Sequence, residues 1–178
     1  MSTLSPAVSE RDHVAGPEDA RVTLVEYGDF ECPHCGAVHP VIQAARKSFG
    51  GNLRFAFRHF PLRSSHPHAL AAAKAAEAAA EQGRFWEMHD RLYRRQTELT
   101  DGDLERHARE LGLDVDRFRR SLGDLAHETR IREDLTSASQ SGARGTPSLF
   151  INGEGYQGSL ERDEIFAALA RAAVAVAR

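Results

Sequence analysis

The pattern of apolar and polar residues predicts two β-strands joined by a helix in the first third of the chain. Residues 21–27 are β-branched and apolar and run into Gly28 and Asp29, which is typical of a buried strand ending in a loop. Apolar and polar residues alternate over part of residues 53–60, which predicts a second strand. Between them, a helical pattern runs from about residue 35 to residue 49 and stops at Gly50. Because a helix connects the strands, we expect them to be parallel.

Residues 65–141 have an almost entirely helical pattern. Ser65 is expected to cap a helix that runs to residue 82, with Pro67 tolerated in its first turn. A second helix is expected over 84–99, and Thr100 and Asp103 form a weak capping box for a third. Two further helices are expected near 114–122 and 125–139.

The chain returns to strand character near its end. Residues 146–151 read as a strand, Asn152 and Gly153 as a two-residue hairpin turn, and residues 155–158 as a short partner strand. Ser159 is expected to cap a last helix from 160 to about 176. The order β-α-β, helical insert, β-β-α predicts an α/β fold.

Composition and charge limit the partners that we expect. The hydrophobic share of 41% and the charged share of 28% are those of an ordinary globular protein, and a net charge of −3 does not favour nucleic acid or anionic lipid. No segment is long and apolar enough to span a membrane. The first thirty residues lack the features of a signal peptide, so we expect a cytoplasmic location, or an extracytoplasmic one if a leader was removed.

The two cysteines of the chain, Cys32 and Cys35, lie three positions apart. A secreted disulfide scaffold would use more cysteines with wider spacing. A disulfide between these two would close a very small loop and constrain the unfolded chain little. Redox chemistry or metal binding therefore explains the pair better than stability does.

The surroundings of the pair favour redox exchange. Cys32 falls where the first strand and its loop meet the helix, so free backbone N–H groups and the helix dipole favour a thiolate there. Pro33 is tolerated in the first turn, and His34 could add positive charge near the sulfur. Cys35 lies one turn inward and suits a resolving thiol.

Zinc binding is the alternative for the same motif. A Cys-x-x-Cys pair is half of a zinc site, and His34, His39, His66 or His68 could supply the other ligands. However, no second pair of ligands follows at the spacing of a zinc finger or ribbon. Two inert buried cysteines are a further, weaker alternative, because the motif lies on a loop.

Glu26 and the Thr146-Pro147 pair are two further candidates. Glu26 is either a surface carboxylate or a partly buried acid with a raised pKa that relays the proton of Cys35. Arg58 or His59 could pair with it and would oppose that rise. A cis bond at Pro147 would place the Thr146 backbone beside the active site, where an extended substrate could pair with it; an ordinary trans proline is the alternative.

These residues together resemble the DsbA-like branch of the thioredoxin superfamily. The resemblance lies in Glu26, residues 30–35 (Phe-Glu-Cys-Pro-His-Cys) and residues 145–153, and it extends over about residues 14–173. It implies a bacterial protein whose thioredoxin fold carries a helical domain over the active site. The implied organisation is a flexible tail at 1–13, thioredoxin-fold halves at 14–64 and 142–178, and an inserted helical domain at 65–141.

The resemblance also implies roles for the site residues. Cys32 would be the nucleophile, Cys35 the resolving cysteine, Pro147 the cis-proline facing them and Glu26 the buried acid. The expected function is a thiol–disulfide oxidoreductase that needs no organic cofactor or metal and acts on protein or small-molecule thiols and disulfides, with an unknown recycling partner. DsbA itself is periplasmic, and no leader is visible here.

Three other functions fit parts of the sequence. A disulfide isomerase or redox chaperone would bind misfolded clients through Phe85, Trp86, Met88, Leu92 and Tyr93, although helical spacing favours core packing for these residues. A zinc-binding module is the second. Glutathione-transferase chemistry is a minor third, because relatives of that kind carry Ser where this chain has Cys32.

Overall fold

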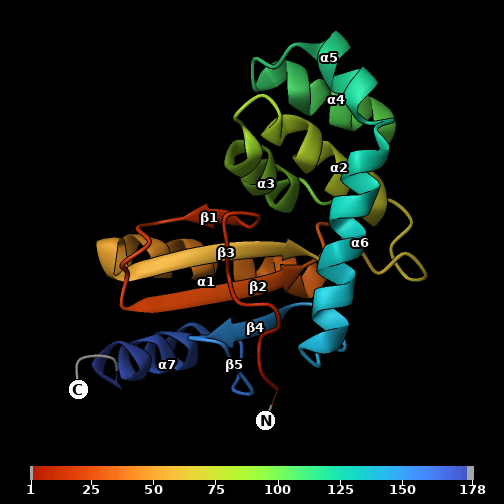
Figure 1. Ribbon diagram of the computed structural model, residues 1–178. Helices are drawn as coiled ribbons and strands as arrows, with labels where there is room; N and C mark the ends of the chain where they lie inside the picture. The colour runs from red at the N-terminus through yellow and green to blue at the C-terminus, as the bar shows by residue number, and fades with distance from the viewer. Residues whose placement is uncertain (1, 176–178) are drawn as a thin grey trace.

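A five-stranded sheet with helices on both faces and a helical insert at one end forms the protein (Figure 1). The computed structural model describes residues 2–175. Its strands are β1 His13–Ala15, β2 Val22–Gly28, β3 Leu53–His59, β4 Ser148–Ile151 and β5 Glu154–Gly155. Its helices are α1 Pro33–Phe49, the 3-10 turn η1 Gly50–Asn52, α2 Ala69–Ala80, α3 Phe85–Arg94, α4 Asp101–Glu110, α5 Val115–Ser121, α6 Leu125–Gln140 and α7 Arg162–Ala175. The predicted α/β fold class is confirmed.

The sheet has the strand order β1-β3-β2-β4-β5. β2 and β3 are parallel, as their helical connection predicts, with Glu26 opposite Phe57 in the register. β4 returns antiparallel to β2 and places Leu149 opposite Glu26. The active-site strand β2 is therefore central, with partners on both sides.

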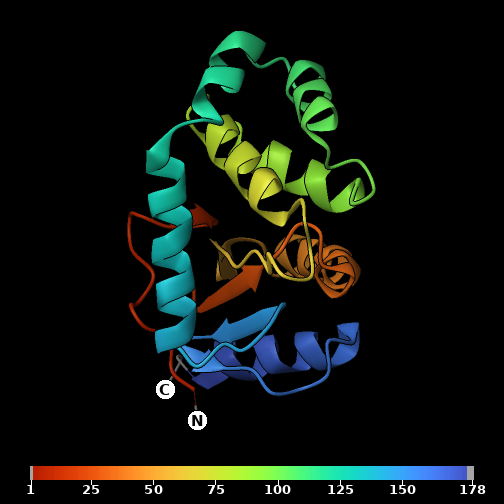
Figure 2. The same cartoon turned by 90° about the vertical axis from the view of Figure 1, so that its right-hand side faces the viewer.

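Alternation along β2 separates two faces of the sheet. Leu24 joins the main core with α1, α7 and the insert, whereas Val25 and Tyr27 join a smaller core with Phe150 and Ala138 of α6. Figure 2 shows α1 and α7 on one side of the sheet and α6 running along the other. Since Glu26 shares the parity of Leu24, it faces α1.

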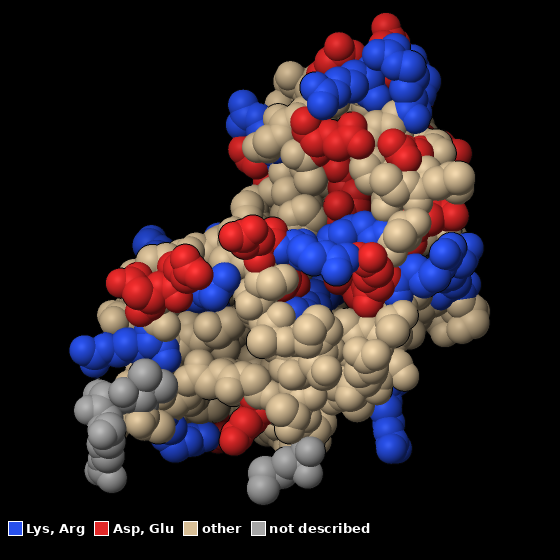
Figure 3. Space-filling view, viewed as in Figure 1, with Lys and Arg blue, Asp and Glu red and all other residues tan. Residues whose placement is uncertain are grey.

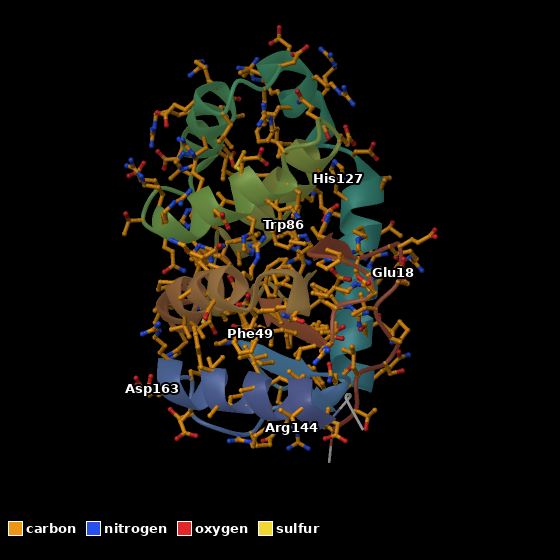
Figure 4. The ribbon with its side chains drawn as sticks, turned by 90° about the vertical axis from the view of Figure 1, so that its left-hand side faces the viewer. Glu18, Phe49, Trp86, His127, Arg144 and Asp163 are labelled. Atoms are coloured by element: carbon orange, nitrogen blue, oxygen red, sulfur yellow. The ribbon has the colours of Figure 1, made fainter. Side chains whose placement is uncertain are left out.

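The helical insert shares its core with the sheet. One cluster of buried side chains continues from β2, β3 and α1 into α2, α3, α4 and α5. Trp86 of α3 lies at this junction, with its ring 5.5 Å from that of Phe55 and under the guanidinium of Arg46 (Figure 4). At the other end of the molecule, Phe49 of α1 packs on Phe166 of α7.

Charged side chains cover the insert and the boundary below it in one view of the surface. In Figure 3, Lys, Arg, Asp and Glu crowd the upper helices, and the lower part of this face is largely uncharged. That mixture of signs on the insert agrees with the small net charge. It offers no single-sign field for a polyanion on this face.

Two predicted helix boundaries in the insert are wrong. Ser65 does not cap α2; that helix begins at Ala69, and the carboxylate of Glu31 accepts the His68 N–H at 2.6 Å from outside the helix. The second helix ends at Arg94 instead of residue 99, and residues 95–97 form a turn. The capping box of Thr100 and Asp103 is confirmed.

The ends of the chain differ from expectation as well. The segment predicted as a flexible tail forms contacts: Leu4 donates to Gly153 O at 2.8 Å, and Asp12 accepts from the buried Arg58 at 2.7 Å. His13 begins the unpredicted strand β1. The last helix starts at Arg162 rather than 160, and its predicted end at Val176 lies outside the described residues.

Candidate active site at the start of α1

Cys32 is the N-cap residue of α1, and Pro33 occupies the first helical position. The Cys32 backbone is extended (φ −70°, ψ 121°), which is the usual conformation of an N-cap residue. Pro33 fits there because its missing N–H would have no partner within the helix. The sulfur therefore sits at the helix start, where other proteins place a capping oxygen.

The environment of Cys32 favours its thiolate. A hydrogen bond from the Cys35 thiol is the largest influence, and the Thr146 hydroxyl and the backbone N–H groups of Cys35 and His34 add to it. Together they lower the pKa of Cys32 to about 5 from 9.0, although burial opposes them. The side chain of His34 is exposed, so at this site its backbone carries the effect.

Cys35 has the opposite environment. It is fully buried in the main core. Burial raises the pKa of Cys35 far above its ordinary value, and the hydrogen bond to Cys32 and the nearby Glu26 raise it further. The two thiols of one helical turn are therefore strongly different: Cys32 ionises readily, and Cys35 stays protonated. Both are free cysteines.

Glu26 is a buried acid under the cysteine pair. It is fully buried, and neither carboxylate oxygen has a hydrogen-bond partner within residues 2–175. Burial raises the pKa of Glu26 to about 8; the charge of Cys32 adds to the rise, and the hydroxyl of Tyr93 partly opposes it. The alternative prediction, that Glu26 is a surface carboxylate, is wrong.

Neither of the expected partners pairs with Glu26. Arg58 lies on the opposite face of the sheet, where it binds Asp12 at 2.7 Å and the Tyr27 hydroxyl at 2.9 Å. His59 bonds to Glu77 of α2 at 2.7 Å. Because the strand registers pair Glu26 with Phe57 and Leu149, its strand neighbours are apolar. This explains why its pKa rises.

The Thr146–Pro147 peptide bond is cis, and it lies against the cysteine pair. The Cys32 Sγ is 3.4 Å from Thr146 O. An open groove of about 630 Å³ starts here and is lined by Arg144, Thr146, Pro147, Tyr156 and Leu160 among others. Arg144 lies in the connection between α6 and β4.

Pairing on the groove side of β4 stops before Thr146. β5 pairs only with Phe150 and Ile151 of β4. The pairing of β4 with β2, on its other side, ends at Ser148. The backbone of Thr146 is thus outside both ladders and beside the reactive sulfur.

Two residues at the site were not predicted from the sequence. Asp29 is buried and accepts hydrogen bonds from the backbone N–H of Glu31 and Leu62, both at 2.8 Å, so it fixes the loop before Cys32. It also bonds to His66 at 2.7 Å. Gln96 reaches from the insert to the backbone of the same loop. A carboxylate between a strand and a Cys-x-x-Cys motif was the available signal for Asp29; nothing in the sequence pointed to Gln96.

The histidines proposed as zinc ligands lie apart from the cysteines or bind other groups. His39 packs against Asp90, His66 binds Asp29 and His68 binds Glu31. Two groups within residues 2–175 could hold a metal ion, His13 with His59 and Glu77, and His39 with His89 and Asp90; in each the ligand atoms lie within 4.8 Å of one another. Neither contains a cysteine.

No helix among residues 2–175 has the length and apolar character needed to cross a membrane.

Curated relatives of the chain are longer proteins. A protein named Na(+)/H(+) antiporter NhaA 1 from Salinispora arenicola is 48% identical over 172 residues, which are 97% of this chain and 26% of that protein. One named Na(+)/H(+) antiporter NhaA from Herminiimonas arsenicoxydans is 44% identical over 164 residues, again 26% of its length. The chain spans about a quarter of these relatives.

Solved structures with this fold include thiol–disulfide proteins. A thioredoxin-like oxidoreductase from Silicibacter pomeroyi is 27% identical with a TM-score of 0.82, over 92% of this chain and 93% of that one. BdbD from Bacillus subtilis shares the fold with a TM-score of 0.86 at 21% identity, over 97% and 98% of the two chains. A family model described as Thioredoxin matches residues 8–171. With the Cys32 thiol at the start of α1, the buried acid and the cis-proline in place, the chain belongs to the thioredoxin family.

Proposed function

We propose that this protein is a thiol–disulfide oxidoreductase that reacts through a mixed disulfide at Cys32, resolved by Cys35. The observation that carries the proposal is the difference between the two thiols of one helical turn. Cys32 has its pKa lowered to about 5, and burial keeps Cys35 protonated. An attacking thiol needs the first property, and a resolving thiol that waits in the core has the second.

The reaction conserves sulfur bonds and protons. The Cys32 thiolate attacks one sulfur of a substrate disulfide, forms a Cys32–substrate bond and releases the other substrate sulfur as a thiolate. Forming the mixed disulfide removes the Cys32 charge, which is one of the causes that keep Glu26 protonated. The ionised fraction of Glu26 then takes the Cys35 proton. The Cys35 thiolate attacks Cys32, which releases the second substrate thiolate and leaves the Cys32–Cys35 disulfide. The backbone of Thr146 would hold an extended substrate next to the sulfur. Run backwards, the same steps oxidise a substrate dithiol.

We expect the DsbA-like, oxidising direction. A lowered Cys32 pKa stabilises the reduced form, which makes the disulfide the stronger oxidant. The value of about 5 for Cys32 lies between those of thioredoxin, about 7, and DsbA, about 3.5. The reduction potential should therefore fall between their values of about −270 and −120 mV.

Trapping experiments test the proposal. When a reduced client protein and an oxidant are added, Cys35→Ser should accumulate a mixed disulfide between Cys32 and the client, because no thiol is left to resolve it. Cys32→Ser should give none. Equilibration with glutathione gives the potential, and insulin reduction with oxidative refolding gives the direction. Equal trapping by both variants would reject the assigned roles, and a potential at or below that of thioredoxin would reject the oxidising direction.

The residues that the redox chaperone alternative requires on the surface are mostly buried. Of the five residues proposed to contact clients, Phe85, Met88, Leu92 and Tyr93 are buried in the core. A client-binding role would need another surface.

The cytoplasmic location remains our proposal, and a reporter fusion that is active only on one side of the membrane tests it. The names of the longer relatives refer to sodium–proton exchange. That name describes a protein about four times as long as the segment that matches this chain.

A further inference from the structure

Gln96 connects the helical insert directly to the reactive loop. It lies in the turn between α3 and α4, far from the cysteines in sequence. Its side-chain Nε2 donates to Phe30 O and to Cys32 O, each at 2.8 Å. A primary amide has two N–H donors, so both are used on this loop.

Gly36 makes room for that amide. A Cβ atom added at Gly36 would lie 2.0 Å from Gln96 Oε1 and 2.6 Å from its Cδ. Gly36 has ordinary helical geometry and a negative φ, so its backbone does not require glycine. An alanine would normally favour a helix by about 1 kcal/mol. The absent side chain at this position is therefore explained by the space that Gln96 occupies.

The turn that carries Gln96 is itself held. Glu98 N donates to Arg95 O at 2.8 Å, and the Glu98 carboxylate binds Arg95 at 2.9 Å and Arg106 at 2.8 Å. His107 of α4 bonds to Glu98 O at 2.9 Å. The amide thus reaches the reactive loop from a braced position.

The Cys32 carbonyl has a second bond of its own. It accepts the Gly36 N–H at 3.1 Å, the first hydrogen bond of α1. Holding this carbonyl fixes the peptide plane between Cys32 and Pro33 relative to the helix start. The Gln96 amide that holds this carbonyl also places an N–H dipole close to the sulfur, which favours negative charge there.

We propose that Gln96 is a positioning residue for Cys32: its amide holds the Phe30 and Cys32 carbonyls, so that the sulfur stays at the N-terminus of α1 facing the N–H groups of His34 and Cys35. The inference rests on the proposed thiol chemistry and adds the insert to it. Through this amide, the insert governs how reactive the thiol is.

Gln96→Ala and Gln96→Glu test the role, with Thr97→Ala in the same turn as the matched control, because Thr97 is exposed. The Glu variant keeps the size of the side chain but offers no N–H. The rate of Cys32 alkylation by iodoacetamide, measured from pH 4 to 9 on the reduced protein, gives its pKa. Near pH 5 we expect a two- to tenfold lower rate for Ala, the worth of about one hydrogen bond, and a larger loss for Glu.

A double-mutant cycle with Gly36 separates positioning from general destabilisation. Gly36→Ala should displace the amide and lower the rate as Gln96→Ala does, and should have little further effect in the Gln96→Ala background. Thermal melts of each variant confirm folding. A wild-type pKa in both Gln96 variants, or additive effects of the two alanines, would overturn the proposal.

The alkylation assay needs no disulfide substrate. An active thiolate with no exchange activity in the wild type would reject the proposed function and leave the Gln96 inference standing. Normal exchange together with an unchanged Cys32 pKa in the Gln96 variants would reject the inference alone.

Discussion

Glu26 shows how one position on a strand determines chemistry. Its neighbours Val25 and Tyr27 face α6, and the period of two turns Glu26 to α1 and the cysteines. Apolar cross-strand partners on both sides leave the carboxyl without a compensating cation. The residue therefore keeps its proton at neutral pH and destabilises the fold when it must ionise.

Glu26→Gln should stabilise the reduced protein and slow its chemistry. The folded-state pKa of about 8 lies above the ordinary 4.5. The contribution of Glu26 to stability is thus complete below pH 4.5 and is lost as pH rises toward 8. We expect the variant to gain up to about 3 kcal/mol in urea unfolding at pH 7 and nothing near pH 4.5.

Release of the substrate from the mixed disulfide should be slower in the same variant, because Cys35 loses its proton acceptor. The exposed Glu161→Gln is the control. A variant with wild-type stability at pH 7 would show that Glu26 ionises freely in the folded protein.

Residue roles were predictable where the chain carries a local signal. Cys32, Cys35 and Glu26 lie within a few positions of one strand–helix junction, and the pattern of that junction indicates their environment. The contacts of Asp29 and Gln96 depend on tertiary packing across more than thirty residues. Arg58 and His59 could not be assigned from the sequence, because the sheet register that puts Arg58 on the opposite face from Glu26 and the bond of His59 to Glu77 both depend on tertiary structure.

At the scale of elements, a carboxylate joins the insert to the sheet. Glu77 of α2 accepts from His13 of β1 at 2.6 Å and from His59 of β3 at 2.7 Å on one oxygen. The ring of His13 also stacks on Phe85 of α3 at 3.5 Å. Two strands and two helices thus meet at one group.

Glu77→Gln should weaken this junction. Burial by itself would raise the pKa of Glu77, but hydrogen bonds from His13 and His59 hold it below the ordinary 4.5. The stability it contributes is present above pH 4.5 and is lost as pH falls through the lower folded-state value. At pH 7 we expect a loss of about 1–3 kcal/mol in urea unfolding, shrinking in acid.

The exposed Glu18→Gln serves as the control for that loss (Figure 4). An equal effect of the two substitutions would mean that Glu77 has no special role in the junction.

Elements were predictable from periodicity, and their ends were less so. The strands β2 and β3 and the capping box of α4 depend on residues close in sequence. The start of α2 depends on Glu31, which supplies its carboxylate from another loop. The strand β1 is three residues long and is stabilised by pairing with β3, a signal that no local pattern carries.

At the scale of the whole molecule, the state of Cys32 affects the stability of the fold. With a pKa of about 5 in the folded protein against 9.0, its thiolate stabilises the reduced form by about 3 kcal/mol at pH 7. A disulfide between Cys32 and Cys35 closes a small loop and contributes about 2 kcal/mol through the unfolded chain.

The reduced protein should therefore melt a few degrees above the oxidised protein at pH 7. Because the pKa of Cys32 is depressed, this advantage fades as pH falls from 9 toward 5, and the order should reverse below about pH 6.5, where the thiolate contributes less than the disulfide. Differential scanning calorimetry of both forms at pH 4 and 7 measures it, with Cys32→Ser as the reference that lacks the Cys32 titration. An oxidised form that is more stable at pH 7 would contradict the low pKa.

Helix α6 passes from the insert to the far side of the sheet (Figure 2). Its first turn follows Asp124 in the insert, the Asp134 carboxylate accepts the His59 N–H at 2.9 Å, and Ser141 just beyond it bonds to the Tyr27 hydroxyl. The insert cannot open without disturbing the sheet to which this helix is bonded. Backbone amides in α2 and in β3 should then exchange with deuterium through one shared opening event, at the same free energy, as a single cooperative unit.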